Sequence, residues 1–316
     1  MSYFFGVEIE LIAKPFVVDR PLLRRVYYEK LASSLNSHGV YAIADKLNGS
    51  YRKHPEHYGK WWITKDGSLG NPEHPLIPLE AVSPILTTGY HWEAQVDIFW
   101  CSWDRIFHTP DKSRLCGSHI HVSPFPRQQF DLIQLKCIAF GVVLFEPHLN
   151  QLLPCNRRNN KYCLANTKRS ERLQTMGAGD NEELYNIWYF IWHMIRGKQD
   201  LRDFMQKGSD PSKDRYVRWN FDNILEGRSG TIEFRGGQCL RGPAETKTWI
   251  SFVLAFVQLC LAQLYKYPAL PVNLRPSMSC FWRDICGAAM QIGVAHNLPS
   301  DWAYMAVDTR RVRGTI

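Results

Sequence analysis

Polar side chains that can do chemistry recur in four short segments in which polar and apolar residues alternate. Thr231–Arg235 alternates threonine, glutamate and arginine with isoleucine and phenylalanine, as in a β-strand that has one buried face. Gly6–Glu10 alternates glutamate with aliphatic residues, Leu79–Ser83 contains one glutamate, and Ser118–Val122 alternates histidine with aliphatic residues. A half-exposed strand with a cross-strand ion pair would explain any one of these segments. Together they predict one sheet with one polar face.

The polar face of this predicted sheet contains side chains that bind divalent cations and phosphate. Because side chains alternate along a strand, the polar residues of each segment share a face. They are Glu8, Glu10, Glu80, His119, His121, Glu233 and Arg235. Two carboxylates ~5 Å apart repel each other by about 3 kcal/mol at an effective dielectric near 20, so a cluster of glutamates requires cations. Hard oxygen ligands favour magnesium or manganese.

The elements around these strands follow from apolar periodicity and from proline and glycine positions. Helices are predicted over residues 90–107, 127–153, 181–206 and 243–264, the second with a kink at Pro147. No repeat, linker or abrupt change of composition marks a boundary. The sequence therefore predicts one catalytic domain over residues 1–316.

Composition narrows the class of protein. Apolar residues make up 45% and aromatic residues 13% of the chain, as in an ordered globular protein. The nine cysteines form no CxxC pair, and no signal peptide precedes the first predicted strand. Reduced thiols and a cytoplasmic location are therefore expected.

Charge and hydropathy argue against nucleic acid and membrane as partners. The net charge is +8, but the basic residues form no long block, and the densest cluster is Arg310–Arg313. A basic balance also attracts anionic substrates such as nucleotides. The most apolar run, Ile250–Leu264, is shorter than the roughly 20 residues that span a bilayer, so a core helix is expected.

The order of the motifs resembles that of the amidoligases, carboxylate–amine ligases that share the fold of glutamine synthetase and gamma-glutamylcysteine synthetase. The motifs are GVEIE, WxITxDGSL, LEAVSP, GSHIHV, an arginine–asparagine loop, RWN and TIEFR, and they cover roughly residues 4–240. The resemblance implies an α+β fold in which a curved antiparallel sheet forms a catalytic funnel backed by helices. Ala81 follows Glu80 where a bulkier aliphatic residue is usual, and the extra N-terminal domain of glutamine synthetase is missing, so its ring-shaped assembly is not expected and the oligomeric state stays open.

The resemblance also implies roles for individual residues. Two or three magnesium or manganese ions would be held by Glu8, Glu10, Glu80, His119 and Glu233. ATP and the substrate carboxylate would be contacted by His121, Arg157, Arg158 and Arg218, with the division among the arginines open. Arg235 would steady the transferred phosphate, and Glu233 and Asp66 complete the catalytic set. Substrate contacts would also come from Asp66 and Ser68 on the amine side and from Asn160 and Asn220.

Amide formation from a free carboxylate requires a better leaving group than oxide. Transfer of the ATP γ-phosphate to the carboxylate gives an acyl phosphate, which an amine attacks, with release of ADP and phosphate. No Walker loop or GxGxxG motif is present, so metal ions and arginines would bind the phosphates. The predicted activity is an ATP-dependent ligase that joins a small-molecule or peptide carboxylate to an amine. The alternatives are a metal-dependent hydrolase that uses His119, His121 and the glutamates, and an inactive binding protein with the same fold.

Overall fold

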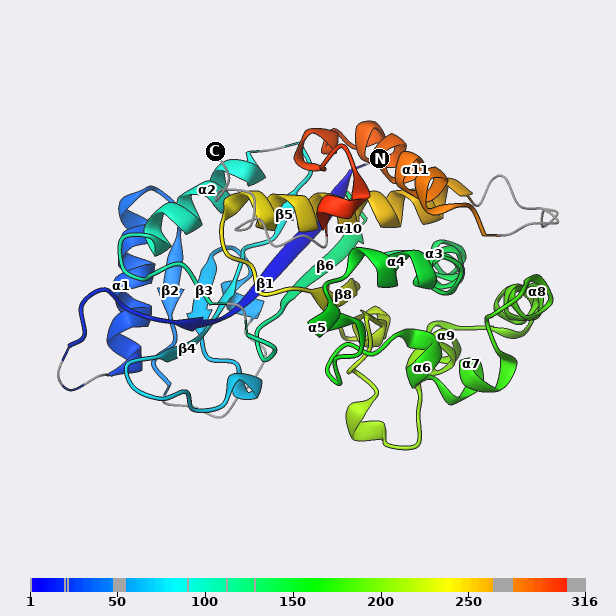
Figure 1. Ribbon diagram of the computed structural model, residues 1–316, viewed down its shortest axis with the longest axis horizontal. Helices are drawn as coiled ribbons and strands as arrows, with labels where there is room; N and C mark the ends of the chain where they lie inside the picture. Colours follow the sequence, from blue (N-terminus) through cyan, green and yellow to red (C-terminus); the bar gives the residue numbers. More distant parts are fainter. Residues whose placement is uncertain are drawn as a thin grey trace. The chain divides into compact units, whose positions relative to one another are not determined.

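The computed structural model describes residues 2–19, 21, 23–47, 55–89, 91–111, 113–127, 129–263 and 275–305. Contacts within the chain divide it into two compact units. The first unit consists of Met1–Gln128 and Glu233–Ile250, and the second of Gln129–Ile232 and Ser251–Ile316. Figure 1 follows the chain by colour from the N-terminus. A single domain over residues 1–316 stays a prediction, and the Arg310–Arg313 cluster lies outside the described residues.

The first unit is built around the long strand β1 (Tyr3–Ala13), labelled in Figure 1. β1 pairs in antiparallel fashion with β4 (Ile77–Val82) on one side and with β6 (Ser118–Pro124) on the other. The strands of this sheet follow the order β2-β3-β4-β1-β6-β8, and β5 (Leu86–Thr87) also pairs with β1. The remaining strands in this order are β2 (Ala42–Ala44), β3 (Trp61–Thr64) and β8 (Ile232–Gly237).

The sheet is mixed, whereas the sequence predicted an antiparallel one. β2 and β3 run parallel, with Ala42 opposite Trp61. The connection between them spans residues 45–60 and includes the short helix η1 (Pro55–His57). A connection of this length allows the parallel arrangement, which a two-residue hairpin turn cannot form. The α+β class is confirmed, and the funnel stays a prediction.

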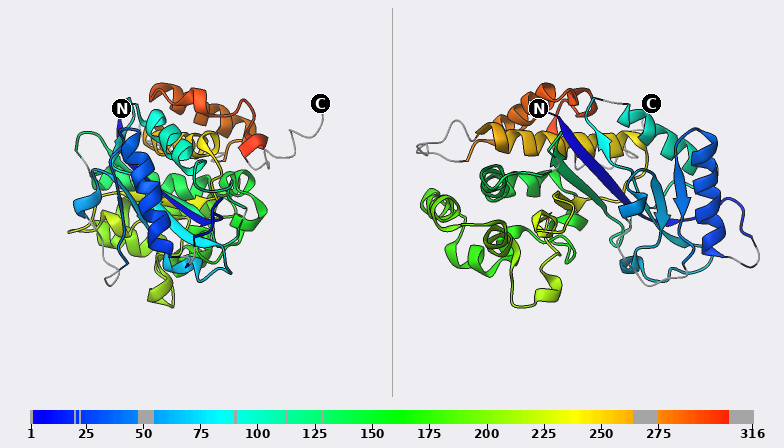
Figure 2. Two further views of the ribbon diagram at one scale, coloured as in Figure 1. Left: turned by 90° about the vertical axis from the view of Figure 1, so that its left-hand side faces the viewer. Right: turned by 180° about the vertical axis from the view of Figure 1, so that it is seen from behind.

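Helices α1 (Arg24–Ser37) and α2 (Trp92–Trp103) complete the first unit together with the beginning of α10 (Pro243–Gln263). α1 packs against β2, β3 and α2, and is seen in front of the strands in Figure 2 (left). Aromatic rings fill the space between helices and sheet, where Trp61 stacks on Phe99 with ring centroids 4.6 Å apart. The tryptophans of α2 are core residues, as the apolar periodicity predicts.

The second unit is mainly helical. Its helices are α3 (Leu132–Leu144), α4 (Glu146–Leu152), α5 (Cys155–Arg158), α6 (Asn166–Arg169), α7 (Glu171–Met176), α8 (Asn181–Tyr189), α9 (Lys198–Gln206), α11 (Met278–Gln291) and the rest of α10. Short helical turns are η3 (Phe190–Met194), which is a π-helix, η4 (Pro211–Lys213), η5 (Asp222–Ile224), η7 (Ala295–Asn297) and η8 (Trp302–Met305). The unit also contains the short strand β7 (Trp219–Asn220).

The single helix predicted over residues 127–153 is two helices, α3 and α4, which meet at an angle of 63°. Phe145 separates them, and Pro147 lies in the first turn of α4. A proline has no backbone N–H and clashes with the carbonyl four residues earlier, so it suits the start of a helix and breaks its interior. The break therefore falls two residues before the proline.

Helix α10 is the one helix of the described residues that is long and apolar enough to cross a membrane by length and composition. The apolar window in Pro243–Ala262 is 72% buried within the protein. Its indole and phenyl groups have partners there, such as Trp249 stacked on Phe234 with centroids 6.0 Å apart. These contacts are those of a core helix, as the sequence predicts.

Candidate active site

The pairing register of β1 places the predicted site residues opposite one another. Glu8 lies opposite His119 of β6, and Glu10 lies opposite Glu80 of β4. Residues directly opposite in paired strands project from the same face of the sheet. His121 follows His119 by two positions and so shares this face. The polar face expected from residue alternation is therefore present on these three strands.

Five of these side chains form a first cluster, in which Glu8 lies between two imidazoles. Oε2 of Glu8 is 2.7 Å from Nδ1 of His119, and Oε1 is 3.0 Å from Nε2 of His121. Oε1 of Glu233 lies 3.6 Å from Nδ1 of His119 and accepts a hydrogen bond from Nη1 of Arg235 at 2.5 Å. Glu8, His121 and Glu233 each offer one ligand atom, and these atoms lie within 4.8 Å of one another. Such spacing suits a single metal ion.

Electrostatics keep the carboxylates of the first cluster ionised. Burial raises the pKa of Glu8, but His121 and His119 outweigh it and leave this pKa well below its ordinary value. For Glu233, burial is likewise outweighed, here by Arg235 and the two histidines, so its pKa is lowered. Burial lowers the pKa of His121, but Glu8 and Glu233 more than compensate and raise it. The cluster therefore offers charged oxygen ligands at neutral pH.

A second cluster brings together carboxylates whose burial outweighs their attraction to His119 and Arg235. Glu10 and Glu80 are 6% and 8% exposed. Burial raises the pKa of Glu80 well above its ordinary value, and repulsion from Glu8, Glu10 and Asp66 adds to it. Burial also raises the pKa of Glu10, and Asp66 contributes repulsion there as well. A cation bound among these oxygens would remove this repulsion.

Asp66 reaches this second cluster from the turn that follows β3. Its Oδ1 accepts a hydrogen bond from the backbone N–H of Ser68 at 2.5 Å and so caps the short helix η2 (Gly67–Leu69). Thr64, two residues earlier, lies opposite Glu80 in the sheet. The Asp-Gly turn predicted at this place thus brings a carboxylate close to the glutamates, whereas Ser68 itself is exposed.

Two residues that the sequence analysis did not single out set the spacing of β6 and β8. A Cβ atom on Gly237 would lie 2.0 Å from Oγ of Ser118, so only glycine fits there. Oγ of Ser118 in turn donates a hydrogen bond to the carbonyl oxygen of Gln238 at 3.1 Å. This contact keeps the histidine strand close to the strand of Glu233. The signal in the sequence was the Gly-Gly pair directly after the alternating segment.

The predicted arginines Arg157, Arg158 and Arg218 belong to the second unit. Arg157 and Arg218 are 3% and 0% exposed. Nη2 of Arg218 donates to the carbonyl oxygen of Arg158 at 3.4 Å, while its Nε and Nη1 have no hydrogen-bond acceptor among the described residues. Burial lowers the pKa of Arg218, and Arg157 adds to this, although Glu146 opposes it. Nε of Arg158 donates to the carbonyl oxygen of Leu153, which fixes that side chain to the backbone.

The two predicted asparagines use their amide oxygens within the fold. Oδ1 of Asn160 accepts from the backbone N–H of Tyr162 at 3.0 Å. Oδ1 of Asn220 accepts from Nε2 of Gln206 at 2.9 Å and from the backbone N–H of Asp222 at 3.0 Å. Substrate contacts by these residues stay a prediction.

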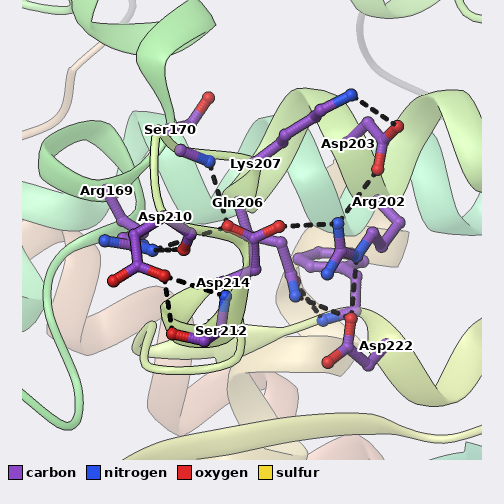
Figure 3. Close-up of polar contacts among 12 residues, drawn as sticks. Arg169, Ser170, Arg202, Asp203, Gln206, Lys207, Asp210, Ser212, Asp214 and Asp222 are labelled. Carbon is purple, nitrogen blue, oxygen red and sulfur yellow. Dashed lines mark hydrogen bonds and ion pairs between the residues drawn. The ribbon is translucent and has the colours of Figure 1, made fainter.

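A polar network, drawn in Figure 3, fixes the segment that contains Arg218 and Asn220. Arg202 donates to Asp203, Asp214 and Asp222 at 2.8–3.0 Å, and Gln206 also donates to Asp222. The same glutamine accepts from the backbone N–H of Phe221 at 2.7 Å. Charge-assisted bonds of this kind are short and directional, so the network holds the backbone after β7 in place.

Comparison with known proteins identifies the family of the chain. The sequence model of one family, described as a putative amidoligase enzyme, matches residues 2–257. A search of curated proteins found no match. The matched residues include the Glu8, His119, His121, Glu233 and Arg235 cluster and most of the second unit. The chain belongs to the amidoligase family.

Proposed function

We propose that this protein is an ATP-dependent ligase that joins a carboxylate to an amine through an acyl phosphate and releases ADP and phosphate. The observation that carries the proposal is the convergence of Glu8, His121 and Glu233 on one point, with Arg235 bonded to Glu233. A carboxylate–imidazole set next to a guanidinium suits the binding of a metal-chelated phosphate. Membership of the amidoligase family supports the same reaction class.

The residues present fit magnesium or manganese. Four glutamates meet on the sheet face, and Arg235 supplies one full positive charge in return. Glu8, His121 and Glu233 would hold one ion, and Glu10 and Glu80 a second. His119 bonds to Glu8 and lies 3.5 Å from Glu10, so it would orient both carboxylates or act as a ligand itself. Bound ions would neutralise the phosphate oxygens during transfer.

The chain's own side chains would then perform three tasks. Arg235 is 13% exposed and held by Glu233, so its planar guanidinium would meet the charge that develops on the transferred phosphate without reorganising. Arg218 would bind an anionic group of the nucleotide or of the carboxylate substrate, because a buried guanidinium whose N–H groups have no acceptor among the described residues is costly unless an anion accepts them. Asp66 would accept the proton released by the attacking amine.

A substrate screen tests this proposal. The protein is incubated with ATP, magnesium and pooled carboxylates and amines, and ADP, AMP and new amides are quantified by mass spectrometry. ADP release that requires both a carboxylate and an amine supports the ligase, and the Glu233→Gln variant should then be inactive. Bond cleavage that depends on zinc and proceeds without nucleotide would favour the hydrolase. Nucleotide binding without turnover in any pool would favour the inactive binding protein.

A further inference from the structure

The first unit is made of two pieces of chain, and each piece contains one cysteine next to a strand of the site. Cys116 precedes β6 in the piece Met1–Gln128, and Cys239 follows β8 in the piece Glu233–Ile250. Both are free thiols and both are buried. The proposed ligase reaction uses neither of them.

The two thiols lie on segments of chain that approach each other closely, since a Cβ atom on Gly237 would lie 2.6 Å from the carbonyl oxygen of Ser118. A side-chain hydrogen bond between them lowers the pKa of Cys116 and raises that of Cys239 well above its ordinary value. Ser113 contacts both sulfur atoms, and Sγ of Cys239 lies 3.6 Å from the carbonyl oxygen of Asp111. Of the two sulfur atoms, Cys116 therefore has the greater thiolate character, and a second thiol lies beside it.

Neighbouring contacts hold the two cysteines side by side. Ser118, two residues after Cys116, donates a hydrogen bond to the carbonyl oxygen of Gln238, which directly precedes Cys239. Gly237 also approaches Ser118 closely. A disulfide requires Cα atoms roughly 4.4–6.8 Å apart, and the approach of Ser118 to Gly237 and Gln238 brings the segments of the two cysteines together. The exposed residue Leu115 shows that the loop before Cys116 lies at the surface, so local opening can admit a small oxidant.

We propose that Cys116 and Cys239 are a peroxide-sensitive thiol pair, whose disulfide covalently joins the two pieces of the first unit. The Cys116 thiolate attacks one oxygen of hydrogen peroxide, breaks the O–O bond and becomes a sulfenic acid, while the other oxygen leaves as water after taking up a proton. The Cys239 thiol then attacks the Cys116 sulfur, its proton passes to the departing hydroxyl, and a second water is released. Two thiols lose two electrons in total, and one peroxide gains them.

The position of the bond determines its effect. Residues 129–232, most of the second unit, lie between the two cysteines in the sequence. The disulfide therefore closes a long loop and removes conformational freedom from the unfolded chain, which stabilises the folded protein. The inference is independent of the proposed ligase activity.

Peptide mapping of the oxidised full-length protein tests the proposal. The exposed cysteines are first replaced (Cys101→Ser and Cys155→Ser), so that they cannot form bonds between molecules. After treatment with hydrogen peroxide and thiol blocking, a tryptic digest without reductant should contain residues 115–127 linked to residues 236–241. The melting temperature should rise by several degrees, and dithiothreitol should reverse the rise. Cys137 and Cys260 are the matched control, because they are equally buried but their pKa values are raised and they should remain thiols.

Variants distinguish the roles of the two sulfur atoms. With Cys239→Ser, Cys116 should stop at the sulfenic acid, which dimedone traps, and oxidation should no longer raise the melting temperature. The proposal is wrong if both peptides stay unlinked at a peroxide dose that oxidises Cys137 or Cys260. It is also wrong if the linked form melts at or below the temperature of the reduced form. The mapping of the protein with Cys116 and Cys239 intact decides the matter even when the serine variant does not fold.

Discussion

Glu10 of β1 lies directly opposite Glu80 of β4, and both carboxyl groups are buried. Like charges in this cross-strand arrangement destabilise a sheet, because the side chains extend from neighbouring Cα atoms on the same face. Burial raises the pKa of both groups, and repulsion from Glu8 and Asp66 adds to it. The protein tolerates this pair at a cost to its stability, which is the expected signature of a site that is completed by a cation.

The first prediction follows from this pair. Glu80→Gln should stabilise the metal-free protein by about 1–3 kcal/mol, because it removes one member of a repulsive pair. The same change should weaken the stabilisation that magnesium gives to the unsubstituted protein and should abolish turnover. Thermal melts with magnesium and with chelator measure both effects. Glu73→Gln, at an exposed position, is the control and should change neither. A metal-free protein destabilised by Glu80→Gln would show that the carboxylate has a structural role instead.

The second prediction concerns the spacing of β6 and β8. Gly237→Ala should destabilise the protein by about 1–3 kcal/mol, since the added Cβ would collide with Ser118 and the strands would move apart. Because His119 and Glu233 lie on these strands, turnover should fall by more than the loss of folded protein explains. Gly59→Ala, where nothing lies within 4 Å of the added atom, should leave both melting temperature and turnover unchanged. Equal melting temperatures for the two variants would contradict the close approach.

The sequence was sufficient to predict the polar face because alternation has a period of two residues. Glu8 with Glu10, and His119 with His121, had to share a face once their segments were strands. The register was not predictable, since the opposition of Glu10 and Glu80 depends on loops that the sequence does not constrain. The parallel pairing of β2 and β3 was missed for the same reason.

The polar network of the second unit shows a different limit of prediction from the sequence. Arg202 bonds to Asp203, Asp214 and Asp222, which are 1, 12 and 20 positions away in the sequence. Only tertiary structure selects these partners from the many acidic residues of the chain. The approach of the Cys116 segment to the Cys239 segment was likewise not predictable, because the spacing of the two cysteines matches no local motif.

The third prediction concerns pH and a buried histidine in the second unit. Burial lowers the pKa of His148, and Arg275 adds to this, although its Nε2–H donates a hydrogen bond to the carbonyl oxygen of Pro276 at 2.8 Å. Its Nδ1 is buried without a partner among the described residues. The neutral form is therefore preferred in the folded protein.

The sign of the effect follows from proton binding. Below the unfolded-state pKa of about 6.5, the unfolded chain binds a proton that folded His148 does not, so stability falls as the pH decreases through this range. His148→Gln should remove this dependence, with a difference in slope of up to about 1.4 kcal/mol per pH unit. Denaturant unfolding at pH 5, 6 and 7 measures it. Parallel pH profiles for the two proteins would show that His148 does not titrate differently on folding.

The fourth prediction separates charge from geometry at Arg235, on the proposed ligase mechanism. A guanidinium grips two oxygens in one plane, whereas lysine offers a single compact charge. Arg235→Lys should therefore lower turnover roughly ten- to a thousand-fold, the range expected for one lost transition-state contact. ATP affinity, measured by calorimetry with magnesium, should change much less. Near-normal turnover in this variant would place Arg235 outside the reacting centre.

The last prediction distinguishes two ways of activating the carboxylate. The carboxylate can attack the γ-phosphorus of ATP, with products ADP and phosphate, or the α-phosphorus, with products AMP and pyrophosphate. The chain has no Walker loop, and the cluster of Glu8, His121, Glu233 and Arg235 suits a terminal phosphate held by metal and arginine, so we expect attack on the γ-phosphorus. Once a substrate is known, its carboxylate is labelled with heavy oxygen and the products are analysed by mass spectrometry. One labelled oxygen should appear in inorganic phosphate, because the oxygen that attacked phosphorus leaves with it when the amine displaces the acyl phosphate. Label in AMP would replace this mechanism by adenylation, and ATP consumption with no transfer of label would mean that hydrolysis is uncoupled from amide formation.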